Sequence, residues 1–123
     1  MDDEGIREIF SGLGTVSIRR MFGGKGVYFD GRIVGVDLYD EVMLKGDDVS
    51  GPELEAAGAR RWVYAGRSGK PVAMPYWSIP DSAMDDPDEL AVWTRKAHES
   101  AVRSEAAKAA APKKAKRPAR KKP

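Results

Sequence analysis

Two adjacent arginines, Arg19 and Arg20, are the residues best suited to binding an anion or a partner's carboxylate. A guanidinium group presents a planar fork of donors that matches carboxylate and phosphate oxygens. Successive side chains of a strand point to opposite faces, so a strand here would aim one arginine at each face. One interpretation is an exposed contact with a partner. The other, which these residues alone favour, is an ion pair with Asp30 or Asp37.

The residues that enzymes use for covalent or metal chemistry are scarce in this chain. It has no cysteine and a single histidine, His98, which we interpret as a structural residue beside the apolar stripe of a helix. The acidic residues within 81–89 lack the spacing of a calcium loop and are better explained by helix capping. Gly23, Gly24 and Gly26 lack the Gly-Lys-Ser/Thr ending of a phosphate-binding loop. We therefore predict a protein that is not an enzyme and has no metal or cofactor.

The C-terminal segment differs sharply in charge from the rest of the chain. Residues 106–123 hold eight Lys/Arg and no acid, a net charge of +8, whereas residues 1–105 hold 13 Lys/Arg and 19 Asp/Glu, a net charge of −6. The segment's Lys, Ala and Pro residues offer no apolar face to offset the entropy of ordering. The sequence therefore predicts one domain over residues 1–105 and a disordered basic tail over residues 106–123.

Such a tail can neutralise phosphates and release their counterions, which gives salt-sensitive, sequence-tolerant binding to DNA or RNA. Its composition resembles the Lys-Ala-Pro tails of linker histones and of some bacterial nucleoid proteins. The alternative is a solubilising extension. The cationic side chains expected to contact nucleic acid are Lys113, Lys114, Lys116, Arg117, Arg120, Lys121 and Lys122.

The N-terminal residues and the hydropathy of the chain indicate its location. Residues 1–4 are acidic where a secretory signal would be basic, and no apolar run approaches the roughly 20 residues that span a bilayer. The absence of cysteine also favours a reducing compartment. We therefore expect a cytoplasmic protein without membrane contact.

The apolar spacing predicts an α+β fold, a two-layer antiparallel sheet with helices packed on it, in the order α-β-β-β-β-α-β-β-α. Helical spacing over residues 2–13 gives way to a period of two over residues 15–45, which indicates a β-meander. Its strongest turn signal is Asp30-Gly31, and Gly23-Gly24 and Tyr39-Asp40 mark further turns. The first helix is expected to bury Ile6, Ile9, Phe10 and Leu13.

A second helix is expected from Ser50, its N-cap, to Gly58, followed by strands at about 61–66 and 70–77. Because Pro75 cannot donate to a ladder, its strand should be an edge or should end there. That edge could offer a groove or a dimer contact.

Asp86-Pro87 begins a long last helix. This helix is expected to bury Leu90, Trp93, Ala97 and Ala101, while Trp62, Tyr76 and Trp77 are assigned to the core rather than to base stacking.

Several short motifs, in register, resemble the N-terminal domain of the TfoX/Sxy family of competence regulators. They are Arg19-Arg20-Met21-Phe22-Gly23-Gly24, Gly26-Val27-Tyr28, Asp30-Gly31-Arg32, Leu44-Lys45, the expected helix from Glu53 to Gly58, Met74-Pro75-Tyr76-Trp77, and Asp86-Pro87-Asp88-Glu89-Leu90 with Trp93. The resemblance covers about residues 3–103 and implies a two-layer domain with the element order given above. It also implies a bacterial, non-enzymatic regulator or adaptor, since competence regulators act alongside a catabolite-activator-type transcription factor.

The resemblance carries no catalytic residue. It identifies the main family motif as the expected contact with a protein partner, through Arg19, Arg20, Phe22, Gly23 and Gly24. The resulting hypothesis is a regulatory or adaptor protein linked to transcription or competence, with non-specific nucleic-acid association through the tail. One alternative is a nucleoid-associated DNA-binding protein whose domain mainly forms a homodimer. Another is a small-molecule-binding domain that uses Arg19 or Arg20 in a cleft.

Overall fold

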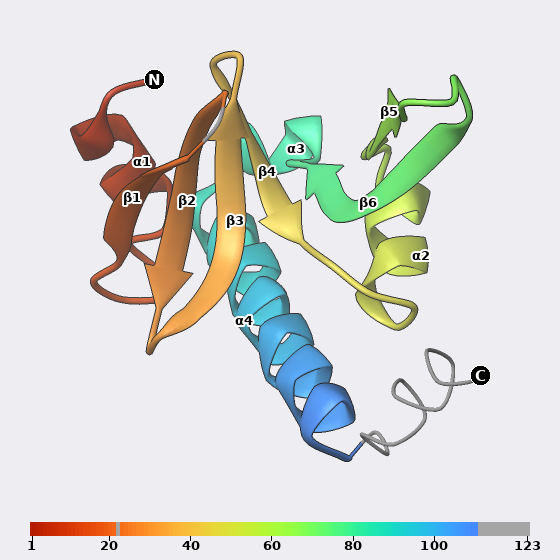
Figure 1. Cartoon of the computed structure of the whole chain (residues 1–123). Coiled ribbons are helices and arrows are strands. Elements are labelled where there is room, and N and C mark those ends of the chain that lie inside the picture. Colours follow the sequence, from red (N-terminus) through yellow and green to blue (C-terminus); the bar gives the residue numbers. More distant parts are fainter. Residues whose placement is uncertain (22, 111–123) are drawn as a thin grey trace.

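The computed structural model describes residues 1–21 and 23–110 (Figure 1). The elements are α1 (Asp3–Ile9), β1 (Ser17–Met21), β2 (Gly24–Phe29), β3 (Arg32–Leu38), β4 (Glu41–Lys45), α2 (Ser50–Ala56), β5 (Arg61–Ala65), β6 (Pro71–Ser78), α3 (Asp81–Met84) and α4 (Pro87–Ala110). The predicted α+β element order is confirmed, with one added turn of helix, α3, before α4. The seven cationic residues predicted to contact nucleic acid lie outside the described residues.

The six strands form one antiparallel sheet in the order β1-β2-β3-β4-β6-β5. The meander of β1 to β4 is confirmed. The prediction that the strand of Pro75 is an edge or ends there is wrong, because β6 lies between β4 and β5 and continues to Ser78. Pairing with β4 stops at Tyr76, and the register with β5 shifts between Arg61 and Val63. Pro75 falls in this irregular stretch, so the ladder does not need the N–H that proline lacks.

Two hairpin turns hold the central strands in register. The backbone φ angle is positive at both central residues of each turn, 56° and 76° at Asp30 and Gly31 and 52° and 64° at Tyr39 and Asp40. This is the pattern of type I′ turns, whose twist matches that of the flanking strands. Both predicted turns are confirmed, and they fix which side of β2, β3 and β4 faces the helices.

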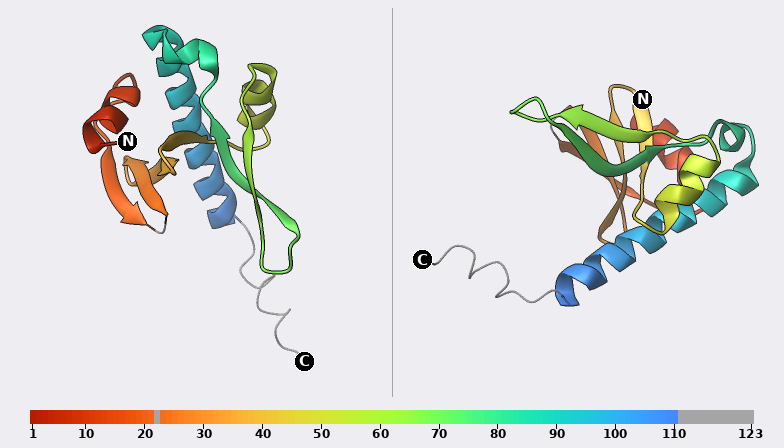
Figure 2. Two further views of the ribbon diagram at one scale, coloured as in Figure 1. Left: turned by 90° about the horizontal axis from the view of Figure 1, so that it is seen from above. Right: turned by 90° about the vertical axis from the view of Figure 1, so that its right-hand side faces the viewer.

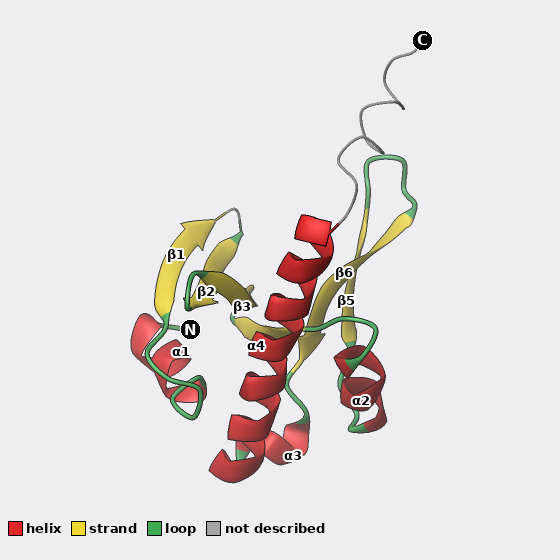
Figure 3. Ribbon diagram, turned by 90° about the horizontal axis from the view of Figure 1, so that it is seen from below, coloured by secondary structure: helices red, strands yellow, loops and turns green. Residues whose placement is uncertain are grey.

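The helices lie on one face of the sheet and leave the other face uncovered (Figure 3). The core between the two layers includes Ile6, Ile9, Phe10, Val27, Val34, Leu44, Leu54, Trp77, Ala97 and Ala101. The predicted burial is therefore confirmed for Ile6, Ile9 and Phe10, but α1 ends at Ile9, and Leu13 is only partly buried at the margin of the core. Gly35 shows how tightly the layers meet, since a Cβ there would lie 2.9 Å from the Phe10 ring.

A second, smaller apolar cluster lies on the helix-free face. Because Leu44 faces the helices, its neighbour Met43 must face away. The cluster contains Val36, Leu38, Met43 and Tyr76, with Ile33, Trp62 and Met74 packed against it. The β5–β6 hairpin turns away from the rest of the sheet and projects on this side (Figure 2). Tyr76 and Trp77 are buried, as predicted, whereas Trp62 is only partly buried.

Helix α4 packs on β3 and β4 through small side chains. Its predicted stripe is correct for Ala97 and Ala101, while Leu90 and Trp93 are only partly buried and pack at the margin of the core. The sequence analysis missed Thr94 and Ser100, which are fully buried. Thr94 satisfies its hydroxyl inside the helix, since its Oγ1 donates to the Ala91 carbonyl at 3.1 Å. These small residues let the helix approach the sheet closely.

The carboxylate of Asp47 joins the start of α2 to the C-terminal half of α4. Its Oδ1 accepts the backbone N–H groups of Val49 and Ser50, each at 3.0 Å. Its Oδ2 pairs with Nε of Arg103 at 2.8 Å. The prediction that Ser50 caps α2 is therefore wrong, because the Asp47 side chain reaches these donors and Ser50 lies in the first turn. Arg103 holds the pKa of the Asp47 carboxyl well below its usual range.

Replacing Asp47 with Asn should destabilise the fold by about 1–3 kcal/mol at pH 7, because the charge-assisted bond to Arg103 is lost. The Asp47 pKa is lower in the folded than in the unfolded chain, so its contribution is complete above about pH 5 and declines as the pH falls below about 4. Urea unfolding at pH 7 and pH 3 measures both effects. Asp48→Asn, at an exposed neighbour, is the control, and equal losses in the two variants would contradict this role of Asp47.

Candidate functional site

The Arg-Arg-Met-Phe-Gly-Gly motif forms the connection between β1 and β2. Its arginines lie at the end of β1 and Gly24 begins β2, while Phe22 lies outside the described residues. Gly23 has a φ of +79°, a conformation that favours glycine. A Cβ on Gly24 would clash with the carbonyl oxygen of Asp37 in β3. Both glycines therefore have a structural reason to be present.

The two arginines of the motif lie on opposite faces of β1, as predicted. The Arg19 guanidinium lies 4.9 Å from the ring centroid of Tyr28, whereas Arg20 lines a hollow at the turn. The interpretation that either one pairs with Asp30 or Asp37 is wrong. Asp30 pairs with Arg32 at 2.9 Å, and Asp37 pairs with the N-terminal amine at 3.5 Å. Both arginines are exposed and have no ion-pair partner within residues 1–21 and 23–110.

The hollow at the motif is polar and measures about 480 Å³. It is lined by Met1, Arg20, Met21, Gly23, Gly24, Lys25, Asp37, Tyr39 and Asp40. The N-terminal amine contacts Asp40, whose hydrogen bond raises the pKa of the amine, and Lys25 donates to Asp3 at 2.7 Å. Most of the charges here are thus neutralised within the chain. Of the side chains that line this hollow, Arg20 is the one still able to pair with an anionic group of a partner.

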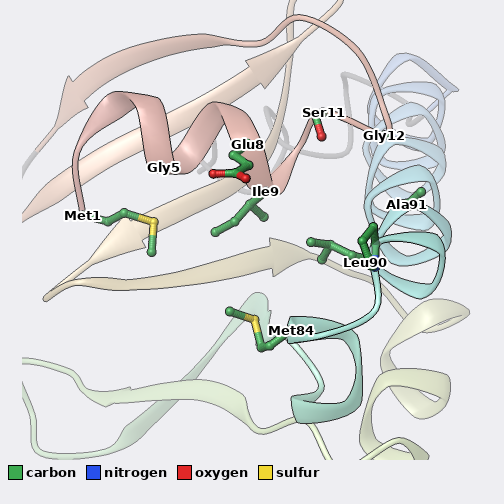
Figure 4. Close-up of a pocket in the computed structure, with 10 residues that line it drawn as sticks. Met1, Gly5, Glu8, Ile9, Ser11, Gly12, Met84, Leu90 and Ala91 are labelled. Atoms are coloured by element: carbon green, nitrogen blue, oxygen red, sulfur yellow. The ribbon is translucent and has the colours of Figure 1, made fainter.

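A second hollow, of about 410 Å³, lies between α1 and the α3–α4 region (Figure 4). Ile9 from α1 faces Met84 and Leu90 across it. Met84 is 52% exposed. Methionine side chains adapt to irregular surfaces, which makes them common at protein-binding sites. Sequence analysis missed this site, although Met84 carried a signal: it falls between two predicted elements and belongs to neither apolar stripe.

Unpaired acidic side chains lie on the elements that form this apolar hollow, and one of them, Glu8, lines it. Within the described part of the chain, the exposed carboxylates of α1 and of the α3–α4 region without an ion pair include Glu4, Glu8, Asp81, Asp85 and Asp88. Asp86 has a different role, because its Oδ1 accepts the N–H groups of Asp88 and Glu89 at the start of α4. The capping interpretation is confirmed for Asp86. The remaining carboxylates give this end of the molecule a negative potential.

His98 is positioned by packing. Its ring meets Phe29 edge-on, with centroids 5.0 Å apart, and its buried Nε2 has no hydrogen-bond partner among the described residues. Across residues 1–21 and 23–110 no group of three or more His, Cys, Asp or Glu side chains is arranged to hold a metal. A helix that could cross a membrane is also not found in that part of the chain.

A bent six-stranded antiparallel sheet with its helices on one face defines a two-layer α+β domain, in which a glycine turn joins the first two strands. The family model of the TfoX N-terminal domain matches residues 8–101. The chain therefore belongs to the TfoX N-terminal domain family, as its motifs indicated. A comparison with curated proteins finds no match.

Gly24→Ala tests whether the family motif is required for folding. The added methyl group meets a backbone carbonyl of β3, which cannot move without breaking the β2–β3 ladder, so we expect a loss of at least about 2 kcal/mol. Gly69→Ala is the control, because a Cβ there has no atom within 4 Å. Its positive φ should cost only about 1 kcal/mol. Urea unfolding measures both, and a Gly24 variant as stable as the wild type would contradict this role.

Proposed function

We propose that this TfoX-family protein is a non-enzymatic regulator or adaptor. Its domain binds a protein partner such as a transcription factor, and its basic tail associates with nucleic acid without sequence preference. The observation that carries this proposal is the separation of charge, −6 over residues 1–105 and +8 over residues 106–123. A polyanion is attracted to one part of this chain and repelled by most of the other.

Helix α4 supports this division by separating the two ends. It begins beside α3, at the apolar hollow around Met84, and ends at the opposite side of the molecule (Figure 1). Its 24 residues span about 36 Å, which exceeds the screening length of about 8 Å at physiological salt. Phosphates bound beyond the end of α4 would therefore be little affected by the carboxylates around Met84.

Polar contacts hold the C-terminal half of α4 on the sheet. Nε of Arg32 donates to Glu105 at 2.7 Å, and Nζ of Lys45 donates to the Ser104 hydroxyl at 3.0 Å. Together with the Asp47–Arg103 pair, these bonds fix the C-terminal half of α4 on the domain. The basic segment therefore starts from a defined position relative to the domain. Linking two binding elements in this way raises the effective concentration of one target near the other.

Two features support the domain as the protein-binding element. The hollow around Met84 is mainly apolar, Glu8 lines it, and the elements that form it carry further exposed carboxylates, which fits an apolar side chain flanked by lysines or arginines. At the motif, Arg20 is free to pair with a carboxylate on the same partner. A cytoplasmic regulator that brings a transcription factor to nucleic acid would use both elements, and linkage to competence is one form of that role.

Replacing the seven Lys/Arg residues after Ala110 with Gln in the full-length chain should abolish most DNA affinity. If each cation neutralises one phosphate, the slope of log K against log salt should fall in magnitude by up to about 6. Fluorescence anisotropy with unrelated duplexes over a salt series measures this. A chain with the same tail residues in scrambled order is the control and should bind like the wild type. An unchanged affinity in the Gln variant would refute the role of the tail.

A further inference from the structure

The acidic domain contains one basic element of its own. Residues 56–80 hold four Lys/Arg and no Asp or Glu, a net charge of +4. Because residues 1–105 have a net charge of −6, the rest of the domain carries −10. The basic segment coincides with β5, β6 and the turn between them, so charge is separated within the fold as well as between domain and tail.

The outer part of the β5–β6 hairpin extends beyond the sheet. Its pairs Val63↔Ala73 and Tyr64↔Val72 lie past Tyr76, where the pairing of β6 with β4 stops. The turn is closed by two backbone bonds, from Gly66 N to Lys70 O at 2.8 Å and from Gly69 N to Gly66 O at 2.9 Å. The result is a two-stranded ribbon that projects on the helix-free side (Figure 2).

Two of the four cations in this segment serve the fold and two do not. Arg60 pairs with Glu41 at 2.6 Å, while Arg61 donates to the Met74 carbonyl at 2.7 Å and lies over the Trp77 ring. Arg67 and Lys70 flank the turn, are exposed, and have no ion-pair partner among residues 1–21 and 23–110. The tip of the ribbon therefore presents two cations without a structural role.

The strands of the ribbon also expose large side chains. Val63 and Tyr64 are 51% and 45% exposed, and Val72 is exposed beside them. The Tyr64 ring packs near Trp62, with centroids 5.7 Å apart. Apolar and aromatic side chains bordered by unpaired cations suit a ligand that combines phosphates with apolar groups, such as the thymine methyl groups exposed in a DNA groove.

We propose that the β5–β6 hairpin is a second nucleic-acid contact, a ribbon that enters a groove of duplex DNA. Arg67 and Lys70 bind backbone phosphates, and Tyr64 and Val72 contact the groove. The major groove, about 12 Å wide, admits a two-stranded β-ribbon. This inference rests on the proposed function, because the DNA is the one that the tail binds. The ribbon tip and the C-terminal end of α4 point toward the same side of the molecule (Figures 2 and 3).

The test uses the full-length chain carrying Arg67→Gln and Lys70→Gln. Each lost phosphate contact lowers the magnitude of the salt slope by about 0.9, so we expect a fall of about 1.8, which corresponds to roughly 60-fold weaker binding at 0.1 M salt when binding at 1 M salt is unchanged. The control carries Arg7→Gln and Arg95→Gln, which change the net charge equally at exposed sites on α1 and α4. We expect its slope to match that of the wild type.

A third variant, Tyr64→Ser, tests the placement in a groove. It removes no charge, so we expect weaker binding with an unchanged salt slope. Thermal unfolding shows whether each variant is folded as the wild type is. The proposal is overturned if the Arg67/Lys70 variant binds like the Arg7/Arg95 control, or if Tyr64→Ser binds like the wild type. If the tail variant loses DNA while the hairpin variants do not, the proposed function stands and this inference fails. If the wild-type chain binds no DNA, both fail.

Discussion

The seating of α4 on the sheet is the constraint on which the rest of the structure depends. Small side chains let the helix approach β3 and β4, and the Asp47–Arg103 pair fixes its C-terminal half. The same Asp47 carboxylate begins α2, whose Glu55 accepts the indole N–H of Trp77 at 2.8 Å. Asp47 thus links the long helix to the short helix, and Glu55 links the short helix to the strand β6. Without α4, a large part of the helix-facing sheet would lose its second layer.

Features set by neighbouring residues were predictable from the sequence. The Asp30-Gly31 turn depends on local backbone preferences, and the alternation of apolar residues in the meander depends on strand geometry. Features set by distant residues were not predictable. The α2 cap belongs to Asp47 because Arg103, 56 residues later, holds that carboxylate in place. Pro75 can lie in an interior strand because the pairing there is irregular and requires no N–H group from it. Thr94 can be buried because its hydroxyl donates to a carbonyl of the same helix.

The candidate site also combines features that the sequence could predict with features that depend on residues distant in the chain. The family motif and its arginines could be found by spacing, but the reason for Gly24 lies in a carbonyl of another strand. The apolar hollow is formed by α1 and the α3–α4 region, and α3 was not predicted at all. The basic hairpin was present in the sequence, yet the average over residues 1–105 concealed it, since four cations are outweighed by the acids elsewhere. Charge has to be counted element by element before it indicates a partner.

The central claim is that nucleic acid and protein bind at different ends of one fold. It is tested most directly by recording backbone amide NMR shifts of the full-length chain while a duplex of random sequence is added. We expect the amides of Tyr64, Arg67 and Lys70 and those after Ala110 to shift together, and the amides of Glu8, Met84 and Leu90 to stay in place. Shifts centred on the apolar hollow around Met84, or no shifts at all, would contradict the claim.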